Sequence, residues 1–301
     1  MSGRFSEERM AAAMRDIAAM LDVSPEGARL LQLTNNAVFA LPRPGIVIRI
    51  ARTHQLLGRA AKVVQLGRWF AEIDAPTIRL APRVKQPVQI RDLVASVWTY
   101  VRPQPPAPTA RDLGFVLREF HALDLPTLAL PAWDPISDAR LRLSDAEYLS
   151  ANDRDFLKAW CDRLEPKIAA LNQRIEPKLV HGDAYVGNLL RGSSSRTILC
   201  DFDATCLGPW QVDLAAAAVG EARFGQTGAH RELAAAYGFD VTTDPLWAVL
   251  REARELKMVV AAVPLLATSA SVAGEFANRL NSVREGDLKS GWRPLANLAP
   301  R

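Results

Sequence analysis

The sequence has 301 residues, of which 49% are hydrophobic and 23% are charged, the composition of an ordinary folded protein. Its net charge of +4 comes from basic residues interleaved with acidic ones, which argues against a nucleic-acid partner. No run approaches the ~18 apolar residues of a membrane span, and Glu7 and Glu8 stand where a signal peptide would be basic. We therefore expect a cytoplasmic protein with no membrane partner. Its three cysteines form no Cys-x-x-Cys pair and fit reduced thiols.

The first hundred residues are predicted to form a small antiparallel sheet with helices. Residues 6–21 have the apolar spacing of an amphipathic helix, with Ser6 as N-cap and Phe5 and Met10 placed for a hydrophobic staple. Residues 54–72 predict a second helix. Short apolar runs between turn residues predict strands at 30–33, 38–41, 46–50, 77–81 and 93–101.

A proline-rich segment at 103–108 is stiff and extended, and it predicts a boundary between two lobes. Thr109 and Asp112 follow as a capping-box-like start to a helix that ends near Leu123. We therefore expect an N-terminal lobe at residues 1–102 and a C-terminal lobe at residues 103–301.

The stretch His181–Asp203, HGDAYVGNLLRGSSSRTILCDFD, concentrates acid-base and metal-ligand residues. Two short apolar runs with Gly-Ser-Ser-Ser between them predict a β-hairpin inside it. Asp183 and Asn188 precede the first strand, and Asp201 and Asp203 follow the second, so the hairpin would bring them close together. Such a cluster of carboxylates with an amide attracts a hard cation.

The spacing of these residues suits phosphoryl transfer. His-x-Asp-x-x-x-x-Asn, followed after a hairpin by Asp-Phe-x, is the spacing of the catalytic loop and metal-binding segment of kinases. In-line transfer needs a carboxylate to orient the attacking hydroxyl and accept its proton, which suits Asp183. It also needs oxygen ligands for magnesium, which suits Asn188 and Asp201. Taken singly, each residue has a structural alternative, since an Asp at a strand end caps turns and a lone His packs or hydrogen-bonds.

With glycine after His181, and with Pro209 and Asp213-Leu214-Ala215 further on, this stretch resembles the aminoglycoside phosphotransferase and choline kinase-like family. The resemblance spans nearly the whole chain from about Leu30. It implies an α+β, two-lobed protein-kinase-like fold, with a small antiparallel-sheet N-lobe that binds the nucleotide and a larger, mainly helical C-lobe.

The resemblance also implies roles for individual residues near the hairpin. Asp183 and His181 would be catalytic, and Asn188, Asp201 and Asp203 would hold Mg²⁺. Asp203 is equally open to a role that only lines the site. Asp213 would hydrogen-bond back to the catalytic loop and stiffen it, or would be an ordinary helix-start carboxylate.

The same resemblance places the crossing between the lobes at residues 99–103. There the backbone of Thr99, Tyr100 and Val101 would bind the purine edge of ATP or GTP.

The first lobe departs from the family in three places. The loop at 34–37 has no glycine, so backbone contacts with phosphates would rely on its asparagines, Asn36 among them, and on Ala37. Arg49 stands where the family most often has a strand lysine. Its guanidinium can fork onto phosphate oxygens, find another partner, or point outward into solvent. The acid that would pair with this cation from the following helix is missing, because Val63 aligns there.

Helices expected from Asp213, at 245–262 and at 271–284 would build the wall for the acceptor. Residues 204–301 contain ten basic and ten acidic residues, so the acidic surface that a polycationic aminoglycoside favours is not indicated. Glu221, Glu252 and Glu255 have two interpretations, as pocket acids or as members of i,i+4 pairs such as Arg251 with Glu255.

We therefore predict a phosphotransferase that moves the γ-phosphoryl group of ATP or GTP to a hydroxyl of a small molecule, such as an antibiotic, a sugar or an amino alcohol. It would act as a monomer or homodimer. One alternative is a catalytically silent nucleotide- or metabolite-binding protein of the same fold, suggested by the altered first lobe. A protein kinase is disfavoured, because no activation loop with a phosphosite is recognisable between Asp201 and Asp213.

Overall fold

The structure, a computed structural model, describes residues 6–33, 36–51, 57–144, 146, 148–193, 196–266 and 269–298. The chain forms two compact units. The first contains Met1–Pro108, Pro126–Leu130 and Gly187–Ala204, and the second contains Thr109–Leu125, Pro131–Val186 and Thr205–Arg301. By packing, the hairpin thus belongs with the N-terminal sheet. The lobe limits predicted from the sequence, 1–102 and 103–301, stay a prediction.

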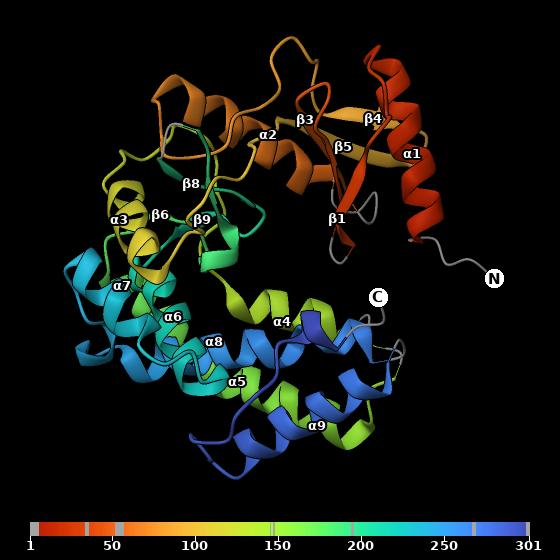
Figure 1. Ribbon diagram of the computed structural model, residues 1–301. Helices are drawn as coiled ribbons and strands as arrows, with labels where there is room; N and C mark the ends of the chain where they lie inside the picture. The colour runs from red at the N-terminus through yellow and green to blue at the C-terminus, as the bar shows by residue number, and fades with distance from the viewer. Residues whose placement is uncertain are drawn as a thin grey trace. The chain divides into compact units, whose positions relative to one another are not determined.

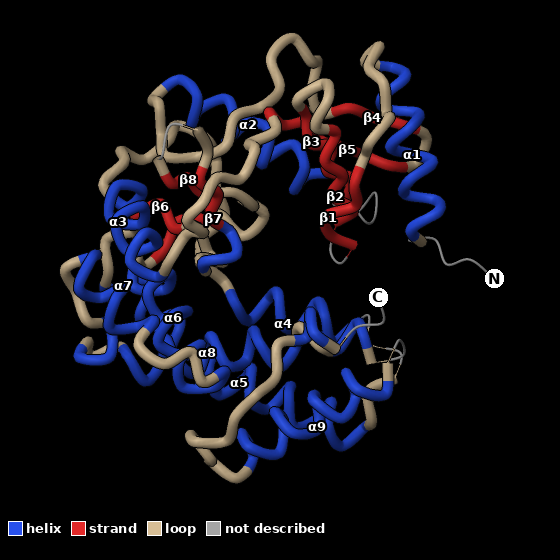
Figure 2. Tube along the Cα trace, viewed as in Figure 1, coloured by secondary structure: helices blue, strands red, loops and turns tan. Residues whose placement is uncertain are grey.

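An antiparallel sheet in the order β1-β2-β3-β5-β4 forms the centre of the first unit (Figure 1, Figure 2). Its strands are β1 (Arg29–Leu33), β2 (Asn36–Leu41), β3 (Ile46–Ala51), β4 (Val88–Ile90) and β5 (Leu93–Thr99). Because side chains alternate between the faces of a strand, the register aligns Phe39, Ile48 and Val97 on one apolar face. Arg49 pairs with Val38 and Ser96 in the register and therefore lies on the other face.

Helix α1 (Glu7–Met20) covers the apolar face of this sheet. Its first turn is capped by the side chain of Ser6, as the sequence predicts. Met10, Met14 and Ile17, which follow the predicted apolar spacing of this helix, are buried in one core with the sheet residues. Phe5, the predicted staple residue, lies outside the described residues.

Helix α2 (Leu57–Glu72) packs on the face that carries Arg49. A Cβ atom on Gly67 would lie 3.1 Å from the Trp98 ring of β5, so helix and sheet approach closely where glycine stands. The ring of Phe70 packs on Phe202, with centroids 4.8 Å apart, and so joins the helix to the end of the hairpin. The predicted start of this helix at His54 lies outside the described residues.

Strands β7 (Leu189–Arg191) and β8 (Thr197–Leu199) form the predicted hairpin. Residues 76–78, in the segment before β4, hydrogen-bond to the hairpin. The N–H of Leu199 donates to Pro76 O (2.8 Å), and the N–H of Ile78 donates to Leu199 O (2.9 Å). The strand predicted at 77–81 is wrong. In the described structure this segment makes single bridges to two different partners, Thr77 to Leu199 and Leu80 to Trp98, and so builds no ladder. Strand β4 was not predicted.

The second unit is mainly helical (Figure 2). Its helices are α3 (Ala110–His121), α4 (Pro135–Ser144), α5 (Ala151–Arg174), α6 (Gln211–Phe224), α7 (Ala229–Tyr237), α8 (Trp247–Val260) and α9 (Ala270–Arg284). Two short strands, β6 (Lys178–Val180) and β9 (Cys206–Gly208), pair antiparallel. The sequence predicts α3, α6, α8 and α9 but not α4, α5 or α7. Within the described residues, no helix has the length and apolar character that a bilayer crossing requires.

Helix α8 is held in the core of the second unit. Its Leu256 is buried with Trp160 of α5 and Phe276 of α9. Its Glu255 accepts a hydrogen bond at 2.8 Å from Arg223, whose side chain is also buried. A buried carboxylate with a buried guanidinium satisfies both charges, and the pair connects α8 to α6.

Candidate functional site

The chain of the second unit makes a tight turn after β6, at His181-Gly182-Asp183. Gly182 has φ +77°, a left-handed conformation that glycine adopts without steric cost. The N–H groups of His181 and Gly182 donate to the carboxylate of Asp213, at 2.7 Å and 2.8 Å. The loop backbone is therefore fastened to the first turn of α6.

The carboxylate of Asp213 also lies 3.0 Å from Nε2 of His121, and its side chain is only 1% exposed. Burial alone would raise the pKa of Asp213. The hydrogen bond and charge of His121, with the loop N–H groups, outweigh burial, and the pKa is lowered. Asp213 is thus held as a carboxylate against the His181-Gly182-Asp183 turn. Its part in catalysis stays a prediction.

The imidazole of His181 is completely buried. Its Nδ1 accepts a hydrogen bond from the N–H of Asp183 at 3.3 Å, and its ring packs edge-on against Phe120. The buried ring thus helps to position the backbone of Asp183. The predicted catalytic role of His181 stays a prediction.

The carboxylate of Asp183 lies between two cations of α8. Its Oδ1 accepts hydrogen bonds from Lys257 Nζ at 2.9 Å and from Arg254 at 3.1 Å, and Lys257 also donates to Gly182 O at 2.7 Å. Burial would raise the pKa of Asp183, but the charges of Lys257 and Arg254 outweigh it and hold the pKa well below its usual range. The side chain remains 38% exposed, so Asp183 is an ionised carboxylate open to solvent.

The hairpin of the first unit brings two of the predicted metal ligands close together. Asn188 is opposite Cys200, whose N–H donates to Asn188 O at 3.0 Å, and Asp201 is the next residue. Asp201 has φ +66°, which turns the chain away from the strand direction.

Arg49 of β3 binds both carboxylates that follow the hairpin. Its guanidinium donates to Asp201 Oδ1 at 3.0 Å and makes two hydrogen bonds to Asp203, and its side chain is 13% exposed. Asn36 Nδ2 donates to the same Asp203 carboxylate at 3.1 Å. Burial would lower the pKa of Arg49, but Asp203 and Asp201 outweigh it and raise the pKa. The outward, solvated alternative for Arg49 is therefore wrong, and the partner that the sequence left open is this pair of acids.

Lys62 of α2 adds a further cation that the sequence did not predict. Its Nζ donates to the backbone oxygen of Asp203 at 2.8 Å. Val63, the residue aligned with the missing acid, is buried. Helix α2 thus contacts the end of the hairpin through Lys62, the residue next to Val63.

The predicted purine-binding segment ends β5. The N–H of Thr99 donates to Arg79 O and that of Tyr100 donates to Gly45 O, both at 2.8 Å. These two donors are engaged within the first unit, whereas Val101 lies against the turn of the hairpin near Gly192.

The residues at the end of the hairpin carry oxygen donors of the kind that magnesium takes. Among the described residues, no group of three or more His, Cys, Asp and Glu side chains is suited to a metal. Magnesium in kinase sites takes one or two carboxylates together with phosphate oxygens and water. Asn188, Asp201 and Asp203 offer oxygen donors of this kind, and that they hold magnesium stays a prediction.

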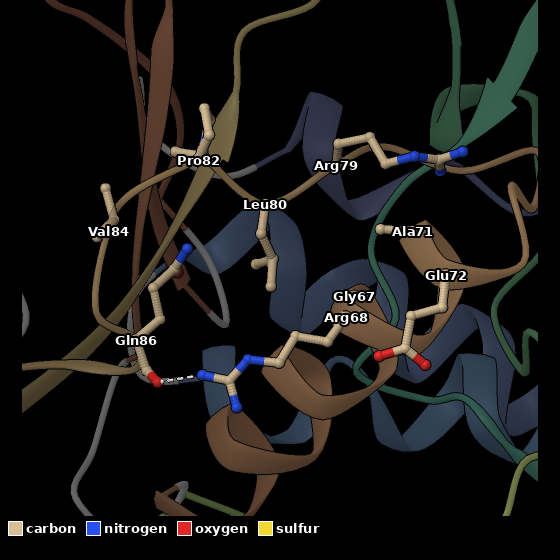
Figure 3. A pocket seen from close by; sticks show the side chains of 10 residues that line it. Gly67, Arg68, Ala71, Glu72, Arg79, Leu80, Pro82, Val84 and Gln86 are labelled. Carbon is tan, nitrogen blue, oxygen red and sulfur yellow. Dashed lines mark hydrogen bonds between the residues drawn. The ribbon is translucent and has the colours of Figure 1, made fainter.

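A pocket of about 350 Å³ lies between α2 and the segment before β4, and it contains none of the predicted site residues (Figure 3). Glu72, Arg68 and Arg79 are among its lining residues, and Arg68 donates to Gln86 O at 2.9 Å. Arg68 thus serves to hold the segment before β4 at Gln86. The pocket has no part in the chemistry predicted for the hairpin.

The three glutamates with two interpretations all have protein partners. Arg251 donates to Glu255 at 3.1 Å, as the i,i+4 spacing predicts. Glu252 accepts hydrogen bonds from Trp160 and Lys167, and Glu221 accepts one from the N–H of His230. They serve packing within the second unit.

Sequence reasoning missed Lys62, Arg254 and Lys257. The spacing of Arg254 and Lys257 on a predicted helix would have placed them on one face. Nothing in the local pattern points from that face to Asp183, which lies more than seventy residues earlier.

The first unit, an antiparallel sheet with a carboxylate-ended hairpin, and the mainly helical second unit, with the His181-Gly182-Asp183 turn, are the parts of a protein-kinase-like fold. The chain belongs to the family described as Phosphotransferase enzyme family (APH), which matches residues 27–253. The family predicted from the His181–Asp203 stretch is thereby confirmed. Curated proteins gave no significant match to the sequence.

Solved structures show the same fold. The GDP and kanamycin complex of APH(2")-IIia has a TM-score of 0.62 at 16% identity, covering 92% of this chain and 99% of that chain. Aminoglycoside phosphotransferase APH(3'')-Id from Streptomyces rimosus ATCC10970 has a TM-score of 0.62 at 15% identity, covering 82% and 98%. A choline/ethanolamine kinase family protein from Mesorhizobium loti has a TM-score of 0.59 at 16% identity, covering 92% and 94%. The predicted α+β protein-kinase-like fold is confirmed, and at these identities the likeness shows the fold alone.

Proposed function

We propose that this protein transfers the γ-phosphoryl group of ATP or GTP to a hydroxyl of a small molecule, with Asp183 as the group that orients the hydroxyl and accepts its proton. The observation that carries the proposal is the state of Asp183. It is an ionised, partly exposed carboxylate on a loop whose backbone is fastened by Asp213. Phosphoryl transfer relies mostly on positioning and electrostatics, so a rigid carboxylate is what the reaction needs.

On the donor side, Asn188 and Asp201 would hold Mg²⁺, with Asp203 as a further oxygen beside them. The ion would neutralise charge on the nucleotide phosphates. Arg49 would turn part of its fork of N–H donors toward phosphate oxygens, because a guanidinium can bridge carboxylate and phosphate. Asn36 and Lys62 would keep Asp203 in place, as they do in the structure.

The purine would meet the end of β5. Since the N–H groups of Thr99 and Tyr100 are engaged, Val101 is our proposed donor to the purine edge. GDP, ADP and ATP complexes of structurally similar proteins support a purine nucleotide as donor.

The catalytically silent alternative has one observation in its favour. Arg49 already pairs with both acids at the end of the hairpin, and a protein that used this pair only for stability would show the same contacts. The two functions differ in product formation.

A screen with Mg-ATP and Mg-GTP across hydroxylated antibiotics, sugars, nucleosides and amino alcohols tests the proposal, with phosphorylated product detected by mass spectrometry. Product that requires both nucleotide and magnesium supports transfer. Nucleotide binding without product from any acceptor would support the silent alternative. A thermal shift with each nucleotide detects binding, because a ligand at 100 times its Kd stabilises by about 2.7 kcal/mol.

A further inference from the structure

Two cations stand beside the proposed catalytic carboxylate, and they bear on the kind of acceptor that the protein takes. Arg254 and Lys257 are three residues apart on α8 and so share a face of the helix. Both donate to the same oxygen, Oδ1 of Asp183. Among these three side chains, the two positive charges and one negative charge sum to about +1.

The donors of these two side chains exceed what Asp183 takes up. A guanidinium has five N–H donors and an ammonium has three. The Nε of Arg254 is buried and has no hydrogen-bond partner among the described residues. Both side chains are partly exposed, at 18% for Arg254 and 30% for Lys257, so an anionic group from solution can reach them.

The two carboxylates of α8, which would be suited to a cationic substrate, are engaged in ion pairs. Glu255 is paired with Arg223 and Arg251, and Glu252 with Lys167. Helix α8 therefore presents positive charge toward Asp183, and its carboxylates serve internal ion pairs.

We infer that Arg254 and Lys257 form an anion-binding subsite for the acceptor, which is an alcohol that carries a carboxylate or phosphate group near the hydroxyl to be phosphorylated. This inference rests on the proposed function for the role of Asp183. The acceptor's anion binds the guanidinium fork and the ammonium, and its hydroxyl then lies within reach of the Asp183 carboxylate. A cationic amino alcohol or aminoglycoside at the same place would meet like charge.

The test separates two anions that these cations can bind: the anionic group of the acceptor and the transferred phosphoryl group. Acceptors are compared in pairs that differ in charge, glycerate with glycerol and gluconate with glucitol, beside choline and kanamycin as cationic alcohols. Wild type is compared with Arg254→Gln and Lys257→Gln. Arg251→Gln is the matched control, because Arg251 lies on the same helix and donates to a different carboxylate, that of Glu255.

We expect the anionic member of each pair to be used at least about tenfold more efficiently than its neutral partner. Each of the two substitutions should raise the KM of the anionic acceptor by about 10- to 100-fold, the effect of losing a charge-assisted contact. The KM of the neutral partner and of the nucleotide should stay within about twofold, and Arg251→Gln should change none of these constants.

Three results would overturn the inference. Lower kcat with equal effect on both members of a pair would place the cations on the phosphoryl group. A preference for choline or kanamycin that survives both substitutions would exclude an anionic subsite. Calorimetric titrations of wild type without nucleotide give a test that needs no turnover. If gluconate and glycerate bind no more tightly than their neutral partners, an anionic subsite is excluded. Failure of the proposed function is separate, since it would appear as anion binding that depends on Arg254 with no phosphorylated product.

Discussion

Removal of the Asp213 carboxylate should be among the most costly single changes in the second unit. This side chain is 1% exposed and accepts hydrogen bonds from the N–H groups of His181 and Gly182, with His121 Nε2 at 3.0 Å. Asp213→Ala would leave three donors in a buried site without an acceptor, at about 1–3 kcal/mol each before water enters. Breaking a buried charged network typically costs about 3–5 kcal/mol, which is our expected loss.

Asp213→Asn retains one oxygen and the shape of the side chain. It turns an NH₂ group toward one of the donors, so we expect a smaller loss of about 2 kcal/mol. Urea unfolding followed by circular dichroism at pH 7.5 measures both. Asp112→Ala is the control, because it removes a half-buried capping-box carboxylate and should cost about 1 kcal/mol. A loss for Asp213→Ala no larger than that of the control would refute the reasoning.

The same comparison has a pH dependence with a definite sign. The pKa of Asp213 is lowered in the folded protein, so its contribution to stability is complete above the unfolded value of about 3.9 and is lost as the pH falls below it. The difference in unfolding free energy between wild type and Asp213→Ala should therefore narrow below about pH 4. A difference that is constant from pH 7 to pH 3 would contradict the network as described.

Three further outcomes are expected. Asp201→Asn should abolish magnesium-dependent turnover with an unchanged circular dichroism spectrum, because it removes the charge that opposes the ion; unchanged rate and magnesium dependence would place the metal elsewhere. Arg49→Ala should raise the KM of the nucleotide far more than that of the acceptor, and equal constants for wild type and variant would remove Arg49 from the donor site. Gly114→Ala should cost about 1–3 kcal/mol in urea unfolding, since its Cβ would lie 2.6 Å from Leu233 O. Gly274→Ala is its matched control and should stabilise the protein by about 0.5–1 kcal/mol, because no atom lies within 4 Å of the added Cβ. Equal effects of the two substitutions would show that α3 and α7 move apart to accept the Cβ of Ala at position 114.

The parts of the fold that could be read from the sequence are those with local signals. Ser6 and Thr109 cap helices as their spacing predicts, and the hairpin forms where two apolar runs flank a Gly-Ser turn. Helix α5 was missed because Pro166 inside it reads as a helix breaker. The segment at 77–81 has the composition of a strand, but its neighbours in space divide it between two partners.

The candidate site divides in the same way. The order and spacing of Asp183, Asn188 and Asp201 are local and could be read directly. The partners of Arg49 could not be read from the sequence, because Asp201 and Asp203 follow it by more than 150 residues. The alternation of side chains along a strand gives only the face of the sheet on which Arg49 lies. The cations beside Asp183 are likewise a product of long-range packing, in which α8 is held by its buried core.

The most direct test of the central claim is phosphoryl transfer by wild type and Asp183→Ala, followed by ³¹P NMR with Mg-ATP and the acceptor that the screen identifies. Wild type should convert the γ-phosphate signal into a phosphomonoester. Asp183→Ala should lower kcat by about 10²- to 10⁴-fold with little change in nucleotide affinity. Asp183→Glu should also be strongly impaired, because position matters more than basicity in a loose transition state. Wild-type turnover by Asp183→Ala would remove this carboxylate from the mechanism and contradict the account.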